Sequence, residues 1–511
     1  MADRLVVVSN RVPLASDAVL DIGGPTAAAV AGAAGDMASV LWFGWSGRLS
    51  GDNALKSTTS RSIGGAVTFV AVDLTESEYD GYLNGFSSGT LWPLLHDLPD
   101  RVRFHAEDLA AYRAVNAMYV DRLVPLLRPS DRIWIQDYHL IPMAALLRQA
   151  GITNPIGLFL HVPFPAPQGL LGWPWHKTLA SDLSAYDLVG FQTRHDELNF
   201  EKFMRSASTG FATGSRAAGP RTMPATGAFP VGINTRLYMA AASSADVAGR
   251  AERLGRCLRD RQIIISVDRL DYTKGLVERL HAYEALLTEF HEHRCTSAMI
   301  QVTAPSRTLV PGYLELRMEQ QAVVERINGR FMTYGWMPVL DIYSKLPRRS
   351  VAALYRLARA ALATPLRDGV NLAAKEYVAA QNPRDPGALI LSRFAGAAEL
   401  LTEALLVEPR DQGQMTAALR AALGMPFDER QDRWRRMIVK LLHHDAVQWH
   451  HAYLAALDRA HKAAAPVAGL WMVPEPQRTR PVRALLKRVV GAPRTSAARL
   501  PRTSSLRTGL A

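Results

Sequence analysis

The turn from Arg367 to Glu376 carries the side chains best suited to chemistry in this chain. It follows the apolar run Ala360–Thr364 and precedes a helix-compatible run from Lys375 to Ala380. In an open α/β sheet, a strand-to-helix turn places backbone N–H groups at the carboxyl edge, where anionic and sugar ligands bind. Asp, Asn, Lys and Glu in one turn therefore indicate a site for a sugar with its phosphate. An ordinary charged loop has the same spacing, so the turn alone does not decide.

A second turn supplies the cations that such a site needs. Arg269 and Lys274 follow a β-branched run and precede a helix, and Gly275 eases close backbone approach. Cations at the carboxyl edge of a sheet suit a diphosphate. We therefore interpret the two turns as one sugar-nucleotide site, in which Arg269 and Lys274 bind the diphosphate. In this interpretation Glu376 binds ribose hydroxyls and Asp368 binds the sugar.

Polar side chains also end strands in the first half of the chain. Arg11, Asp137 and His161 each follow a predicted strand, and Gly23-Gly24 lies in a loop before a helix. A single histidine at a strand end is more often structural than catalytic, and one glycine pair is weak evidence. Their shared position at strand ends nevertheless predicts that they converge on one side of a cleft.

The sequence predicts neither a metal site nor a cofactor. It contains no Asp-x-Asp and no His or Cys cluster with metal-ligand spacing. A diphosphate leaving group would then be stabilised by Arg, Lys and helix-end N–H groups. The missing Asp-x-Asp also argues against a haloacid-type phosphatase. Neither a Gly-x-x-x-x-Gly-Lys-Ser/Thr loop nor a Gly-x-Gly-x-x-Gly motif is present.

Composition places the chain among globular proteins of two or three domains. Its 511 residues are 48% hydrophobic, which is enough to fill several cores. No apolar run approaches the roughly 18 residues of a membrane-spanning helix, and the N-terminal run is too short for a signal peptide. The two cysteines, Cys257 and Cys295, exclude a disulfide framework. We therefore expect a cytoplasmic protein without membrane insertion.

The net charge of +12 is concentrated at the C-terminus. Residues 473–511 contain nine basic residues and one acidic residue, so the rest of the chain is close to balanced. This distribution argues against a nucleic-acid partner. We expect residues 463–511 to form a disordered basic tail, for which weak binding to an acidic surface is the functional alternative.

Short apolar runs alternate with helical patterns, which is typical of parallel βαβ units. The sequence predicts an α/β protein with two Rossmann-like, doubly wound domains, at residues 1–231 and 232–462. A final helical region, Trp434–Leu457, is expected to pack across both. The predicted strands are Leu5–Ser9, Val40–Phe43, Ala66–Val72, Arg132–Gln136, Ile156–Leu160, Leu188–Phe191, Ile263–Val267, Ala298–Thr303, Phe331–Thr333, Ala360–Thr364 and Leu389–Leu391.

Seven motifs, in order along the chain, resemble the trehalose-6-phosphate synthase family. They are Leu5–Arg11, Trp42–Gly47, Leu91–Pro93, Ile135–His139, His161–Pro165, Asp268–Gly275 and Thr364–Gly369. The resemblance implies a GT-B fold and retaining, metal-independent glucose transfer from a nucleotide donor, usually UDP-glucose, to glucose 6-phosphate. The implied product is α,α-trehalose 6-phosphate. Donor and acceptor are then the small-molecule partners.

The resemblance also implies roles for individual residues. The donor site would comprise Arg269 and Lys274 on the diphosphate, with Gly23, Gly24, Leu346, Leu372, Ala373, Ala374, Lys375 and Glu376 around the nucleotide. The acceptor site would comprise Arg11, Leu83, Trp92, Asp137 and Arg307, with Trp42 or Trp45 lining a sugar site. The catalytic group would be Asp368, His161, Arg269 and Lys274, with Asp368 holding the transferred glucose and His161 beside it.

Three positions depart from the family pattern. Pro25-Thr26 follows Gly24 where Leu and a small residue are usual, and Gln168 stands where Glu is common. Leu83 stands where the family usually has an aromatic residue that binds the acceptor phosphate. Loss of that phenol removes a charged hydrogen bond of about 1.5–3 kcal/mol. A sister transferase that uses glycerol 3-phosphate or a cyclitol phosphate therefore stays open.

Two other classes are weaker alternatives. A sugar-nucleotide 2-epimerase would need acid/base carboxylates around C2 of the donor sugar and no phosphorylated acceptor. A non-catalytic relative would be expected to lose the donor residues, yet Arg269, Lys274, Asp368 and Glu376 are all present. The sequence leaves open the donor base, the role of the tail and the oligomeric state, a homo-oligomer included.

Overall fold

The computed structural model describes residues 4–12, 39–51, 58–63, 67–208, 223–258, 261–307 and 310–464. Contacts between Cα atoms divide the chain into residues 1–464 and 465–511, and all described residues belong to the first unit. Gly23, Gly24 and nearly all of the predicted basic tail therefore lie outside the described residues. Among those described, no helix is both long and apolar enough to span a bilayer.

The first sheet has eight strands in the order β3-β4-β2-β1-β5-β6-β7-β8. Neighbouring strands are parallel, except that β3 runs antiparallel to β4. The strands are β1 (Arg4–Arg11), β2 (Ser39–Ser50), β3 (Thr58–Ile63), β4 (Val67–Thr75), β5 (Arg132–Gln136), β6 (Ile156–Phe159), β7 (Leu188–Phe191) and β8 (Ala225–Ala228).

The second sheet has six strands, all parallel, in the order β11-β10-β9-β12-β13-β14. Its strand order reverses direction beside β9, as expected for a doubly wound sheet. The predicted fold class is thus confirmed. The strands are β9 (Gln262–Arg269), β10 (Ser297–Ala304), β11 (Val339–Ile342), β12 (Ala360–Ala363), β13 (Ala388–Ser392) and β14 (Leu405–Val407).

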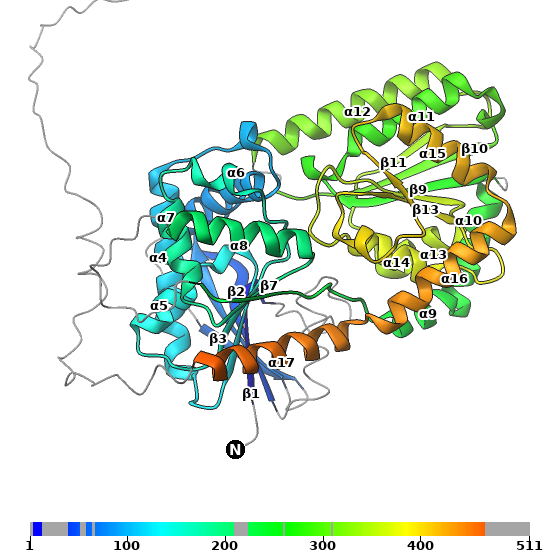
Figure 1. Ribbon diagram of the computed structural model, residues 1–511. Helices are drawn as coiled ribbons and strands as arrows, with labels where there is room; N and C mark the ends of the chain where they lie inside the picture. The colour runs from blue at the N-terminus through cyan, green and yellow to red at the C-terminus, as the bar shows by residue number, and fades with distance from the viewer. Residues whose placement is uncertain are drawn as a thin grey trace, which may run out of the picture. The chain divides into compact units, whose positions relative to one another are not determined.

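Helices connect the strands in both halves (Figure 1). Those of the first half are α2 (Glu76–Tyr79), η1 (Asp80–Leu91), α3 (Trp92–Leu95), η2 (Pro99–Arg101), α4 (Ala106–Leu123), η3 (Val124–Leu126), η4 (Tyr138–Leu140), α5 (Met143–Gln149), α6 (Pro167–Leu171), α7 (His176–Ser184) and α8 (Arg194–Ser208). Those of the second half are α9 (Thr235–Ser243), α10 (Ala245–Cys257), η5 (Tyr272–Lys274), α11 (Leu276–Glu289), η6 (His291–His293), α12 (Pro311–Phe331), α13 (Arg348–Leu357), α14 (Leu372–Ala380), η7 (Gly396–Glu399), α15 (Gln412–Gly424), α16 (Phe427–His443) and α17 (Ala446–Ala464).

Each sheet has an apolar core on both faces, because successive side chains of a strand point to opposite sides. In β1, Val6 and Val8 pack into one core, whereas Leu5 and Val7 pack into another. The second sheet repeats this pattern, and Ile264 of β9 faces α11 and α15. Near-continuous apolar runs therefore fix the strands as central and doubly covered.

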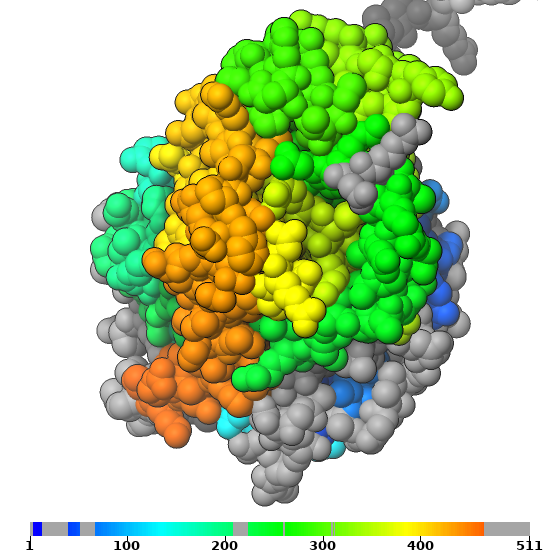
Figure 2. Space-filling view, turned by 90° about the vertical axis from the view of Figure 1, so that its right-hand side faces the viewer, coloured from blue at the N-terminus to red at the C-terminus, as the bar shows by residue number. Residues whose placement is uncertain are grey.

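The last helix, α17, packs on the first sheet although it follows the second in sequence. A Cβ on Gly157 would lie 2.4 Å from the Tyr453 hydroxyl oxygen, and one on Gly190 would lie 2.6 Å from the same ring. These two glycines therefore permit close packing of Tyr453, whose ring stacks on Trp134 with centroids 4.6 Å apart. Helices α16 and α17 form the orange band on the face drawn in Figure 2.

One predicted element was wrong. The predicted strand Phe331–Thr333 does not form: Phe331 ends α12, and the strand of that region is β11, at the edge of the second sheet. The predicted helical region Trp434–Leu457 consists of α16 and α17, which are interrupted at His444 and Asp445. The interruption lies against the chain crossing, the segment 229–234 that leads from the first sheet to the second. A Cβ on Gly232 in this segment would lie 2.4 Å from the His444 carbonyl oxygen. The predicted boundary at residues 231 and 232 falls in this crossing and stays a prediction.

Candidate functional site

The turn after β9 brings the two predicted donor cations to the carboxyl edge of the second sheet. Arg269 is the last residue of β9 and is exposed, whereas Lys274 is buried at the end of η5. Gly275 has φ +65°, and a Cβ there would lie 2.3 Å from the Thr364 carbonyl oxygen. Glycine is therefore required for the turn to approach the end of β12.

A fully buried arginine, Arg279, stabilises this turn through hydrogen bonds. The Arg279 guanidinium donates to Asp268 Oδ2 at 2.8 Å, to the Gly275 carbonyl at 3.0 Å and to the Lys274 carbonyl. Burial raises the pKa of Asp268, although the charge of Arg279 opposes the shift. The backbone that presents Arg269 and Lys274 is thus held at both ends by one side chain.

The second turn meets the first through an ion pair. Lys274 Nζ lies 2.5 Å from Asp368 Oδ2, with side-chain exposures of 10% and 13%. Asn371, which has φ 60°, donates to the same carboxylate oxygen at 3.3 Å and caps α14 by accepting from the Ala374 N–H at 3.0 Å. The predicted sugar-binding carboxylate is therefore fixed by donors from both turns.

The second turn also touches the first sheet. A Cβ on Gly369 would lie 2.1 Å from the His161 carbonyl oxygen, so only glycine permits this approach. His161 Nε2 lies 2.8 Å from Gln136 Oε1, and burial lowers the pKa of His161 to about 3. Its Nδ1 is buried and has no hydrogen-bond partner among the described residues. The imidazole ring is therefore neutral at pH 7 and held in place by Gln136.

Asp137 directly follows β5 and caps η4 in a strained conformation, with φ 72°. Its Oδ1 accepts from the backbone N–H groups of Tyr138 at 3.0 Å and His161 at 3.3 Å. Burial raises the pKa of Asp137 to about 6, although these bonds and the charges of Arg307 and Arg269 oppose the shift. The carboxylate is thus held by backbone N–H groups of the residues that follow β5 and β6.

Arg307 reaches from the second sheet to the predicted acceptor residues. Its guanidinium lies 4.0 Å from the ring centroid of Trp92 and donates to the hydroxyls of Tyr313 at 2.6 Å and Tyr138 at 3.2 Å. Arg269 lies 5.8 Å from the same Trp92 ring. A predicted donor cation and a predicted acceptor cation therefore both lie near the ring of a predicted acceptor tryptophan.

Arg11 ends β1 beside Trp45, with its guanidinium 5.7 Å from that ring. Gly47, at φ +85°, makes room for it, because a Cβ there would lie 2.6 Å from the guanidinium. Trp42 instead is buried and donates to Ser9 Oγ at 2.7 Å. Of the two tryptophans that the resemblance left open, Trp45 is therefore the one beside the predicted acceptor cation.

Leu83 lies on η1, a π-helix with i→i+5 hydrogen bonding, which is rare and frequent at functional sites. The side chain is partly buried and packs against the apolar core of the first sheet. Its neighbour Tyr82 is fully buried and donates to Asn10 Oδ1 at 2.8 Å. The remaining tyrosine of this segment is thus already used in holding the residue before Arg11.

The predicted nucleotide residues gather at the start of α14 and before α13. Leu346 and Leu372 are partly buried against one core, and the first turn of α14 adds Ala373 and Ala374. The Lys375 side chain turns away and donates to the Val231 carbonyl at 2.5 Å in the chain crossing. Burial lowers the pKa of Lys375 to about 8 and raises that of Glu376 to about 7. The described residues that were predicted to surround the nucleotide are Leu346, Leu372, Ala373, Ala374, Lys375 and Glu376.

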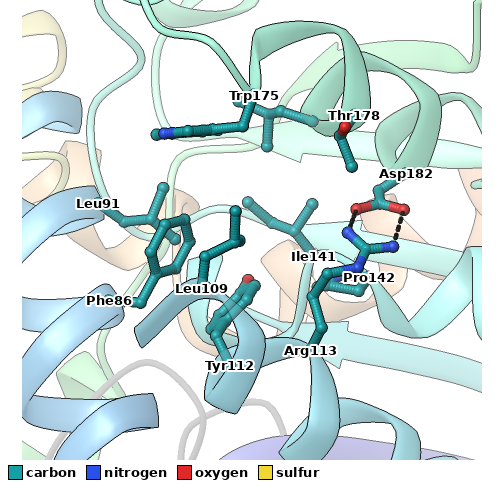
Figure 3. Close-up of a pocket in the computed structure, with 11 residues that line it drawn as sticks. Phe86, Leu91, Leu109, Tyr112, Arg113, Ile141, Pro142, Trp175, Thr178 and Asp182 are labelled. Atoms are coloured by element: carbon teal, nitrogen blue, oxygen red, sulfur yellow. Dashed lines mark hydrogen bonds and ion pairs between the residues drawn. The ribbon is translucent and has the colours of Figure 1, made fainter. Parts of the chain in front are cut away.

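A pocket lies elsewhere, beside η1 in the first half of the chain (Figure 3). Apolar side chains such as Phe86 and Leu109 surround it, and the ion pair of Arg113 with Asp182 closes one side. None of the predicted site residues lines it. This pocket is therefore separate from the candidate site.

Sequence reasoning gave no individual role to three polar residues of the site. Asp271, Arg279 and Asn371 bond to residues with predicted roles. Asp271 stood within the motif Asp268–Gly275 and Asn371 within the turn Arg367–Glu376, where Asp-x-Thr and Asn before a helix are capping signals. No group of three His, Cys, Asp or Glu suited to a metal occurs in the part of the chain that the structure describes.

Comparisons with known proteins agree with the fold described above. The model of glycosyltransferase family 20 matches residues 4–459. A curated trehalose-6-phosphate synthase of Sinorhizobium fredii is 40% identical over 447 residues, covering 87% of this chain and 96% of that protein. A solved UDP-forming α,α-trehalose-phosphate synthase of Burkholderia xenovorans, in complex with glucose 6-phosphate, is 40% identical with TM-score 0.83, covering 89% and 100%. A solved Escherichia coli structure bound with UDP-2-fluoro glucose is 38% identical with TM-score 0.83, covering 89% and 99%.

Proposed function

Because this chain belongs to glycosyltransferase family 20, we propose that it is a UDP-forming trehalose-6-phosphate synthase. It transfers glucose from UDP-glucose to glucose 6-phosphate with retention and forms α,α-trehalose 6-phosphate. The observation that carries the proposal is that Arg269 of the donor turn and Arg307 of the acceptor group both lie near the ring of Trp92. Similar proteins hold glucose 6-phosphate and a UDP-glucose analogue.

In the donor half, Arg269 and Lys274 bind the diphosphate, and Asp368 holds the hydroxyls of the transferred glucose. Support comes from the ion pair of Lys274 with Asp368, which puts the phosphate cation and the sugar carboxylate side by side. Glu376 binds ribose hydroxyls from α14, and backbone groups at the start of that helix complete the nucleotide site. Lys375 contributes through its backbone, since its side chain bonds to Val231.

In the acceptor half, Arg11 and Arg307 bind the 6-phosphate, while Asp137 and Trp92 contact the sugar. The positions of Arg307 over Trp92 and of Asp137 at the end of β5 support these roles. The acceptor's anomeric hydroxyl attacks C1 of the donor glucose from the side that the diphosphate leaves. The bond from C1 to the diphosphate oxygen breaks, the new glycosidic bond forms, and the acceptor's proton passes to the diphosphate.

The protein's part is to hold both sugars in line and to stabilise the charge that grows on the diphosphate. Arg269 and Lys274 do this at the turn that Arg279 braces. His161, whose pKa burial lowers to about 3, is neutral at pH 7 and lies beside the transferred sugar.

One assay tests the proposal. The purified protein is incubated with UDP-, GDP- or ADP-glucose and with glucose 6-phosphate or glycerol 3-phosphate, each with and without EDTA. We expect trehalose 6-phosphate from UDP-glucose and glucose 6-phosphate, unchanged by EDTA. No trehalose 6-phosphate from any donor contradicts the proposal, and product from glycerol 3-phosphate alone favours the sister transferase that Leu83 kept open.

We also propose a cytoplasmic location. Support comes from the phosphorylated substrates and from two cysteines that are both unpaired and exposed, as suits a reducing compartment. Whether copies of the chain associate stays a prediction. Size-exclusion chromatography with light scattering measures the oligomeric state.

A further inference from the structure

Asp271 is a fully buried carboxylate at the meeting point of the two halves of the site. Its Oδ1 accepts from the Thr273 N–H at 3.0 Å, from Thr273 Oγ1 at 2.9 Å and from Trp92 Nε1 at 3.4 Å. Its Oδ2 accepts from Arg307 and from the Tyr313 hydroxyl, both at 3.3 Å. Both oxygens of one carboxylate are thus engaged by donors from three separate segments.

These donors belong to opposite halves of the proposed site. Asp271 and Thr273 lie in the turn that carries Arg269 and Lys274, so they belong to the donor half. Trp92 and Arg307 belong to the acceptor half, and they bond to the same carboxylate. A shift of the donor turn would therefore move Trp92 and Arg307 through their hydrogen bonds to Asp271.

The carboxylate is ionised in this setting. Burial tends to raise the pKa of Asp271, but the charges of Arg307, Arg269 and Lys274 outweigh burial and hold it below the usual range. A negative charge is what allows these cations to lie close together before substrate phosphates arrive. Its hydrogen bonds are charge-assisted, and such bonds are about twice as strong as neutral ones.

We propose that Asp271 is a positioning residue that couples donor binding to acceptor binding. The inference rests on the proposed function and goes beyond it. Binding of a diphosphate to Arg269 and Lys274 fixes the donor turn. Through Asp271 the fixed turn then holds Trp92 and Arg307 in the geometry that the sugar phosphate needs.

The experiment measures the affinity for glucose 6-phosphate by calorimetry, with the full chain alone and saturated with UDP. In the wild-type protein we expect UDP to tighten glucose 6-phosphate binding by at least about fivefold, the lower end of typical couplings. In Asp271→Asn, which keeps the shape and removes the charge, we expect the ratio to fall below about twofold. Trp92→Phe removes one donor to Asp271 and should give an intermediate ratio.

Asp268→Asn is the matched control. Asp268 is a largely buried carboxylate of the same turn, and its cation partner Arg279 lies on the donor side. This variant should change the affinity for UDP and leave the coupling ratio at the wild-type value. Circular dichroism checks that each variant is folded.

The outcomes separate the inference from the proposed function. If UDP and glucose 6-phosphate each bind the wild-type protein but do not affect one another, the inference is overturned while the function stands. A wild-type ratio in Asp271→Asn overturns it as well. If Asp271→Asn does not fold, Trp92→Phe decides alone, and an unchanged ratio there overturns the inference. If neither ligand binds the wild-type protein, the proposed function fails and the inference fails with it.

Discussion

Replacing Lys274 by methionine tests the centre of the proposed donor site. The change removes the ammonium group and keeps the length of the side chain. In the structure this group pairs with Asp368, and in the proposed reaction it meets the leaving diphosphate. A hydrogen bond to a charged group contributes about 1.5–3 kcal/mol, and about 1.4 kcal/mol corresponds to a factor of ten. We therefore expect kcat/KM for UDP-glucose to fall by about 10- to 150-fold.

The same change should also lower the free energy of unfolding. It leaves the Asp368 carboxylate without its cation, although Asn371 still donates to it at 3.3 Å. Removing one partner costs about 3–5 kcal/mol in a fully buried pair and about 0–1 kcal/mol in an exposed one. With side chains 10% and 13% exposed, this pair lies between, so we expect a loss of about 1–3 kcal/mol.

The assay is continuous detection of UDP release at varied UDP-glucose and saturating glucose 6-phosphate, with urea unfolding measured in parallel. Lys440→Met is the matched control, because Lys440 pairs with Glu403 at 2.8 Å immediately before β14, at the amino edge of the sheet. That control should leave kcat/KM near the wild-type value. If Lys274→Met stays within about threefold of wild type, Lys274 does not bind the departing diphosphate and the reasoning is refuted.

The other predictions concern four further residues. Leu83→Tyr should lower KM for glucose 6-phosphate by about tenfold if the restored phenol reaches the phosphate; an unchanged KM means that η1 points this position elsewhere. Arg307→Ala should raise KM for glucose 6-phosphate more than KM for UDP-glucose, and equal effects contradict the division into half-sites. Arg279→Leu should cost about 3–5 kcal/mol in urea unfolding, because it leaves a buried carboxylate without its cation. The affinity for UDP should rise with pH through about 7, since burial raises the pKa of Glu376 to about 7 and the carboxylate form accepts ribose hydrogen bonds. Glu376→Gln, measured by calorimetry, should remove this part of the pH dependence and leave the titration of UDP itself.

The central strands could be predicted from sequence because their apolar runs are long relative to the strands. Arg132–Gln136 and Leu188–Phe191 form β5 and β7 with the predicted bounds. The edge strands were missed because pairing, not composition, makes them strands: β8 is Ala-Thr-Gly-Ala and is held by β7. The π-helix η1 was also missed, since it depends on close packing of Gly81 and Gly85 against α4.

In the candidate site, topology made some residues predictable and others not. Side chains at the ends of parallel strands share one edge of a sheet, which is why Arg11 could be grouped with Asp137, and Arg269 with Asp368, from sequence alone. Asp271 acts through groups that reach it only in the folded chain, such as Trp92, which is 179 residues away. No local pattern contains that information.

Two of the cations that the proposal gives to substrate phosphates already have carboxylate partners in the structure. Lys274 pairs with Asp368, and Arg307 pairs with Asp271. An arriving diphosphate must therefore compete with Asp368 for Lys274, which offsets part of the phosphate's binding free energy. Lys274 and Asn371 both donate to Oδ2 of Asp368. On the proposed roles, a diphosphate that takes Lys274 therefore frees Oδ2 for an additional hydrogen bond from a sugar hydroxyl. A sugar without its diphosphate would meet this oxygen still paired with Lys274, so the site favours the intact nucleotide sugar over free glucose.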